Sequence, residues 1–138
     1  MNINILSTDK VCMLILLSSL EYNIIMANTG LLNIETLKEI ILTELEAKKA
    51  ENIKILDVSK SGIAKYMIFA SARSSKNVSA IAQHVADHIK NTTKIRVGLD
   101  GINNTTWAVL DLDGIIVHIF HPETRQYYNV EGIFENTN

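Results

Sequence analysis

Apolar and polar positions along the chain repeat first with a helical period. After Asn33, a residue type that often caps helices, four apolar positions recur three and four residues apart, which places their side chains on one helical face. These positions are Leu37, Ile40, Ile41 and Leu45. The pattern predicts an amphipathic helix that begins at Asn33 and ends near Asn52.

The period then changes to that of strands. Residues 53–58 and 66–70 are rich in branched and aromatic side chains and are separated by a turn at 59–62. The second run is too continuously apolar for a half-exposed strand, so it predicts a strand buried on both faces.

A second helical stripe follows. Ser74 or Ser75 can cap a helix whose apolar residues lie on one face, with His84, Asp87, His88 and Lys90 on or near the other. The apolar stripe consists of Val78, Ile81, Ala82, Val85 and Ile89. After Thr93, we expect a short strand at 94–97 and a loop at 98–104.

The last hairpin is the most informative segment. Asp113-Gly114 lies between two strand-like runs and is a typical two-residue turn, because glycine tolerates the positive φ that such turns need. This turn fixes the register. One face of the hairpin then carries only apolar residues and must face the core. Those residues are Ala108, Leu110, Leu112, Ile115, Val117 and Ile119.

The other hairpin face is mixed. The register places Asp111 opposite Ile116, Val109 opposite His118, and Trp107 opposite Phe120. Aromatic anchors among scattered polar groups are typical of protein interfaces, which need desolvated contact area and orientation. The alternative is that a helix of the same chain covers this face.

Composition and charge favour one globular domain without a nucleic-acid-binding excess of basic residues. The chain has 138 residues, 47% hydrophobic, with a net charge of -2 and a single cysteine, which excludes a disulfide framework. Residues 53–96 hold eight basic and two acidic residues, a net charge of +6, whereas residues 97–138 hold one basic and six acidic residues, a net charge of -5. The acidic end could steer the protein toward a basic partner.

The first 25 residues have a different pattern. Val11–Leu17 is an apolar run much shorter than the roughly 18 residues of a membrane span. Because Met26 stands just before the first well-marked helix, we expect residues 1–25 to be an over-called start or an N-terminal arm, with a docked extra helix as the alternative. Residues 26–138 are expected to form a single domain.

Three kinds of chemical site have candidate residues in this sequence. Asp111 and Asp113 resemble a magnesium-binding carboxylate pair, but Asp113 is explained as a turn former and Ser71-Ala72-Arg73 lacks the glycine of a phosphate-binding turn. Arg73 and Lys76 near a helix start could bind an anion. His118 and His121 lack an evident third metal ligand. We therefore expect no enzyme, no cofactor and no metal, with a magnesium-dependent, nucleotidyltransferase-like enzyme as the alternative.

Several motifs follow one another in a fixed order. They are Leu56–Ser59, Tyr66–Ser71, Ser74–Val78 with Ala80–Ala82, Trp107–Asp111, and Gly114–Phe120 followed by Arg125, Tyr127, Tyr128, Glu131 and Phe134. Together they resemble the ribosomal silencing factor family, also called RsfS or Iojap, over roughly residues 32–135. The chain departs from that family at Lys65, where Asp is usual, at Lys76-Asn77, where Arg-His is usual, and at Phe134, where Trp is common. No polar contact of the family is carried over to positions 65 and 77.

The resemblance implies a fold and a function. The fold would be an α/β domain with a mixed sheet flanked by helices, in a nucleotidyltransferase-like topology. Members of the family bind the fourteenth ribosomal protein of the large subunit at its intersubunit face. They prevent the small subunit from docking and repress translation when nutrients are scarce, while some eukaryotic relatives serve organellar ribosome assembly.

The hairpin register and the resemblance together predict a contact strip, which we define as Trp107, Asp111, His118 and Phe120. Tyr66, Tyr127 and Tyr128 are nearby candidates. The expected partner is the large ribosomal subunit, with a minor contact to ribosomal RNA as an open alternative. We expect a cytoplasmic protein that does not bind membranes. The oligomeric state stays open, a homodimer being one alternative.

Overall fold

The computed structural model describes residues 33–101 and 105–136, which form one mixed sheet with helices on both faces. The expectation for residues 1–25 lies outside the described residues. The strands are β1 (Glu51–Asp57), β2 (Tyr66–Ser71), β3 (Gly98–Asp100), β4 (Trp107–Asp111) and β5 (Ile115–Phe120). The helices are α3 (Ile34–Ala47), the 3-10 turn η1 (Ser59–Ser61), α4 (Ser75–Thr92), α5 (Pro122–Tyr128) and α6 (Val130–Glu135).

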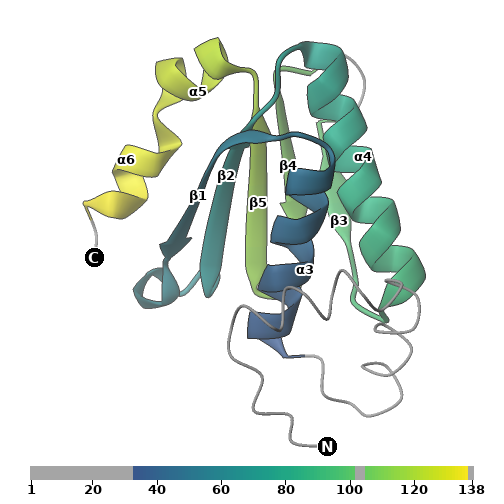
Figure 1. The fold of residues 1–138 in the computed structure, drawn as a ribbon. Helices are drawn as coiled ribbons and strands as arrows, with labels where there is room; N and C mark the ends of the chain where they lie inside the picture. Colours follow the sequence, from purple (N-terminus) through teal and green to yellow (C-terminus); the bar gives the residue numbers. More distant parts are fainter. Residues whose placement is uncertain (1–32, 102–104, 137–138) are drawn as a thin grey trace, which may run out of the picture.

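The five strands lie in the order β1-β2-β5-β4-β3. Among the strands of the described residues, β2 and the middle strand β5 pair in parallel, and the other neighbours are antiparallel. Figure 1 shows α3 and α4 side by side on one face of the sheet, while α6 runs along the β1 edge. The mixed sheet flanked by helices confirms the predicted fold class. No helix of the described ranges is long and apolar enough to cross a membrane.

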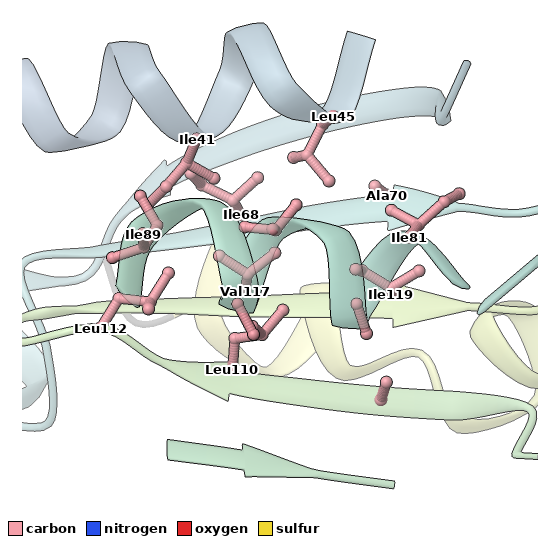
Figure 2. Close-up of a cluster of buried hydrophobic side chains, with 14 of the residues drawn as sticks. Ile41, Leu45, Ile68, Ala70, Ile81, Ile89, Leu110, Leu112, Val117 and Ile119 are labelled. Atoms are coloured by element: carbon pink, nitrogen blue, oxygen red, sulfur yellow. The ribbon is translucent and has the colours of Figure 1, made fainter. Parts of the chain in front are cut away.

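The main core lies between the sheet and the two long helices, on what we call the inner face. Figure 2 shows side chains of α3 and α4 pointing toward those of β2, β4 and β5, with Ile41, Ile68 and Val117 among them, all without exposed surface. The predicted stripes of both helices are buried. Burying large aliphatic side chains stabilises the fold by about 1.5–3 kcal/mol each, so this face holds most of the stabilising contacts.

The β4–β5 hairpin has the predicted register. Trp107 pairs with Phe120, Val109 with His118 and Asp111 with Ile116. The turn has φ of 49° at Asp113 and 101° at Gly114, as a two-residue hairpin turn requires. All six apolar residues predicted for the core side of this hairpin are fully buried.

The helix starts are as predicted, but one helix end is not. Asn33 Oδ1 accepts a hydrogen bond from Thr36 N at 2.9 Å, and Ser74 caps α4 through Asn77 N. The expectation that the first helix continues to Asn52 is wrong, because α3 ends at Ala47 and residues 51–57 already form β1. Lys49, with φ of 60°, reverses the chain in the left-handed region, which few non-glycine residues adopt.

The third strand is also displaced from its predicted position. Residues 94–97 form no strand, and the predicted loop begins instead with β3 at Gly98–Asp100. Ile95, Val97 and Leu99 pack against the inner core in alternation, so side-chain periodicity cannot separate the two segments. Pairing with β4, Leu99 opposite Leu110, decides where the strand forms.

The sequence analysis did not predict α5 and α6. Arg125 ties them to the sheet: its Nη1 donates to Asn52 O at 2.8 Å and to Ser71 Oγ at 2.9 Å, and its Nε donates to Glu131. Lys54 of β1 pairs with Glu131 and Glu135 of α6. The available signal was Pro122, because proline is favoured in the first turn of a helix.

Gly101 is expected to be essential for the approach of the chain to β4. It has φ of 82°, and a Cβ there would lie 2.4 Å from Trp107 O, whereas Gly62, with φ of 74°, has open space around it. Gly62→Ala should cost about 1 kcal/mol of left-handed strain. Gly101→Ala should cost about 2 kcal/mol more, because backbone must move. Urea unfolding of both variants measures the difference, and equal losses would contradict the prediction.

Candidate functional site

The outer face of the sheet, opposite α3 and α4, is covered unevenly. Its own small core consists of Val58, Met67, Phe69 and Phe120, and Val130 and Phe134 of α6 pack against it. The alternative that a helix of the same chain covers the mixed face of the β4–β5 hairpin is therefore correct at Phe120, which belongs to this small core. Beyond this small core, the outer face keeps half-buried and exposed side chains, which are Trp107, Val109, Ile116 and Asp111.

The predicted contact strip lies on this outer face, but its four residues differ in exposure. Phe120 is fully buried and His118 is only 6% exposed, while Trp107 is half-buried and Asp111 is exposed. The expectation of one open strip is wrong for Phe120 and His118. Val130 and Phe134 of α6 pack against the small core that contains Phe120, and the rings of Phe69, Trp107 and Phe120 lie next to His118. The accessible part consists of Trp107 and Asp111, with half-buried Val109 and Ile116 beside them.

The three candidate tyrosines do not lie on one surface. Tyr66 packs against the inner core, and its hydroxyl donates to Glu35 Oε1 at 2.5 Å. This hydrogen bond, with a second from Lys38, lowers the pKa of Glu35. The expectation that Tyr66 lies beside the strip is therefore wrong.

The other two tyrosines belong to α5. The ring of Tyr128 lies 5.4 Å from that of Trp107, and Tyr127 meets Tyr128 edge-on at 4.9 Å. Their exposed fractions are 54% for Tyr128 and 81% for Tyr127. The structure thus brings Tyr128 together with Trp107 and places Tyr127 at the margin of the same surface.

The indole of Trp107 is held by a hydrogen bond to the buried His118. Its Nε1 donates to Nδ1 of His118 at 3.1 Å. Burial lowers the pKa of His118 to about 4, because a charged imidazole loses its hydration in an apolar environment. His118 is consequently neutral at physiological pH and keeps Nδ1 free to accept.

The residues that were candidates for anion or metal binding lie in different places and do not form one site. Arg73 Nε pairs with Glu51 Oε1 at 2.8 Å. Asp111 and Asp113 line a shallow hollow together with Arg96 and Gly98. Within residues 33–101 and 105–136 there is no group of three or more His, Cys, Asp or Glu side chains that could hold a metal ion.

The covering helices were the feature that the sequence analysis missed. Val130 and Phe134 decide which half of the outer face is closed, yet α5 and α6 have seven and six residues and no fully buried side chain. Helices this short show no sustained apolar stripe. In the sequence, Phe134 stands out only as part of a motif.

The buried, neutral His118 should make stability depend on pH. Its pKa is lowered from 6.5 to about 4 in the folded state, so the unfolded chain binds more protons between these values. Stability is therefore lost as pH falls through this window. Between pH 7 and pH 4.5, urea unfolding of the wild type should lose about 2 kcal/mol more than that of His118→Phe. Parallel losses in the wild type and His118→Phe would contradict the assignment.

Comparisons with known proteins agree with the fold and the motifs. Residues 32–138 match the family described as "Ribosomal silencing factor during starvation". The ribosomal silencing factor RsfS of Zymomonas mobilis is 40% identical over 101 residues, covering 72% of this chain and 76% of that protein. The RsfS protein of Bacillus subtilis is 30% identical over 105 residues, covering 75% of this chain and 88% of that protein.

Solved structures share the architecture as well. The crystal structure of a Chromobacterium violaceum protein superposes with a TM-score of 0.72 at 27% identity, covering 75% of this chain and 88% of that one. A Bacillus halodurans structure has a TM-score of 0.63 at 29% identity, covering 72% and 93%. The family match spans all the described residues and so includes the Trp107 hairpin and the α5–α6 cover. On these grounds the chain belongs to the ribosomal silencing factor family.

Proposed function

We propose that this protein binds the large ribosomal subunit at its intersubunit face, through the fourteenth ribosomal protein of that subunit, and thereby prevents the small subunit from joining. Translation is repressed as a result. The proposal combines membership of the ribosomal silencing factor family with one structural observation, the uncovered half of the outer sheet face around Trp107 and Asp111.

The shape and chemistry of this surface suit a protein partner. Trp107 is half-buried and flanked by the exposed ring of Tyr128, and Val109 and Ile116 extend the apolar area along β4 and β5. Aromatic side chains that are held in place supply contact area at a small entropic cost. Because these side chains stand on paired strands, the sheet presents this area without rearrangement of the backbone.

Charge favours a basic partner. The residues from 97 onward carry a net charge of -5. On the outer face, Asp100 and Asp111 are exposed next to the apolar area. Among the described residues, no ion pair involves Asp111. Complementary potentials accelerate encounter and fix orientation, and ribosomal proteins are commonly basic.

The mechanism is occlusion. Two ribosomal subunits must share one surface, so a protein that occupies part of it competes directly with subunit joining. A standard interface buries about 800 Å² on each partner, which the open half of the sheet and the adjoining rim of α5 could supply. No bond is made or broken, and the effect depends on affinity and position.

Removing the aromatic anchor should weaken binding. Trp107→Ala and Tyr128→Ala should each reduce affinity for purified large subunits about tenfold or more, as expected for residues at the centre of an interface. The matched control is Ile63→Ala, since Ile63 is 62% exposed on the turn between β1 and β2. In a sucrose gradient, the wild type and the control should keep the subunits apart, while both aromatic variants should let them join. If the aromatic variants are folded and still sediment with large subunits as the wild type does, the proposed binding surface is wrong.

The acidic side chain should act mainly on the rate of association. Asp111→Asn should lower the association rate and reduce its dependence on salt, whereas Asp111→Lys should lower the rate further. Asp87→Asn is the control, because Asp87 is exposed on α4 and is bonded to Gln83. Stopped-flow binding at two ionic strengths measures both effects. A salt dependence that is the same in Asp111→Lys and wild type would contradict a basic partner at this position.

A further inference from the structure

Four aromatic rings form a continuous layer on the outer face of three neighbouring strands. The ring of His118 on β5 stacks on Phe69 of β2 at 5.1 Å and 7°, and on Phe120 at 5.8 Å and 12°. Trp107 of β4 lies 5.0 Å from Phe120 and 5.9 Å from His118. The imidazole thus occupies a place between two phenylalanines.

The polar atoms of this imidazole are used unequally. Nδ1 accepts a hydrogen bond from Trp107 Nε1 at 3.1 Å. Because the indole N–H can only donate, Nδ1 carries no proton and the neutral ring has its hydrogen on Nε2. Nε2 is buried and has no hydrogen-bond partner among the described residues.

A histidine is therefore a costly choice for packing alone. A buried donor without an acceptor loses its hydrogen bond to water and gains none in return. A phenylalanine would fill the same place between Phe69 and Phe120 without that loss. What the imidazole supplies and phenylalanine lacks is a hydrogen-bond acceptor for the indole of Trp107.

We propose that His118 is a positioning residue, which holds the indole of Trp107 in the orientation that the ribosomal partner binds. This inference rests on the proposed function. His118 itself is too deeply buried to meet a partner, so it acts through Trp107. Fixing the ring in advance removes an ordering cost from the binding step. Loss of the acceptor should therefore weaken binding about three- to tenfold.

The first test observes the indole directly in the full chain. Trp107 is the single tryptophan of the sequence, so a ¹⁵N-labelled protein gives one indole N–H signal. In the wild type, this signal should be protected from exchange with solvent. His118→Phe should shift it and speed its exchange. His118→Asn should restore much of the protection, because its side-chain oxygen can take the place of Nδ1. His84→Asn, on the opposite side of the sheet, is the control.

The second test measures stability and binding of the same variants. At neutral pH, His118→Phe should resist urea at least as well as the wild type, yet bind purified large subunits three- to tenfold more weakly. His118→Asn should bind more tightly than His118→Phe despite its smaller side chain. A role in packing alone would give the reverse order.

Each outcome decides the inference. An unchanged indole signal in His118→Phe, unchanged binding, or a clear loss of stability in that variant overturns it. Failure of His118→Asn to restore indole protection also overturns it. If the wild type itself does not bind large subunits, the proposed function fails. In that case the indole signal still shows whether His118 orients Trp107.

Discussion

The two-residue turn at Asp113-Gly114 is the constraint on which the rest of the structure depends. It sets the register of β4 against β5, and a shift of one residue would exchange the two faces of the hairpin. In the observed register, Leu110 and Val117 enter the main core while Trp107 and His118 face the other way. Because β5 also pairs with β2 in the centre of the sheet, this local turn determines what the outer face of the whole domain presents.

The two faces of the sheet have different roles: the inner face holds the main core, and the outer face holds the proposed binding surface. The inner face is closed by α3 and α4, of 14 and 18 residues, whose apolar stripes are fully buried. The outer face is only partly closed by the short α5 and α6, which are attached through Arg125 and the Lys54 ion pairs as well as through Val130 and Phe134. A domain whose core lies on one side can leave part of its other side open without losing the fold.

How much the sequence predicts depends on whether a signal is local. The caps at Asn33 and Ser74, the helical stripes and the hairpin register are local, and each is confirmed. The end of α3 is not marked by glycine, since Lys49 adopts the left-handed conformation, and the position of β3 depends on pairing with β4. The candidate site was predicted as a set of positions on one face. Exposure could not be predicted, because α6 covers residues far from it in sequence.

His118 lies where the covered and open parts of the outer face meet. A buried imidazole whose Nε2 has no partner in the part of the chain that the structure describes is the kind of local inconsistency that a sequence selected for stability alone would remove. It lies at the boundary between the covered and open halves of the outer face, in ring contact with Phe69 on one side and Trp107 on the other. The covered half thus supplies a rigid support for an aromatic side chain at the edge of the open half. Such a support has a purpose if Trp107 must present one orientation to a partner, and it has none if that ring is simply part of the core.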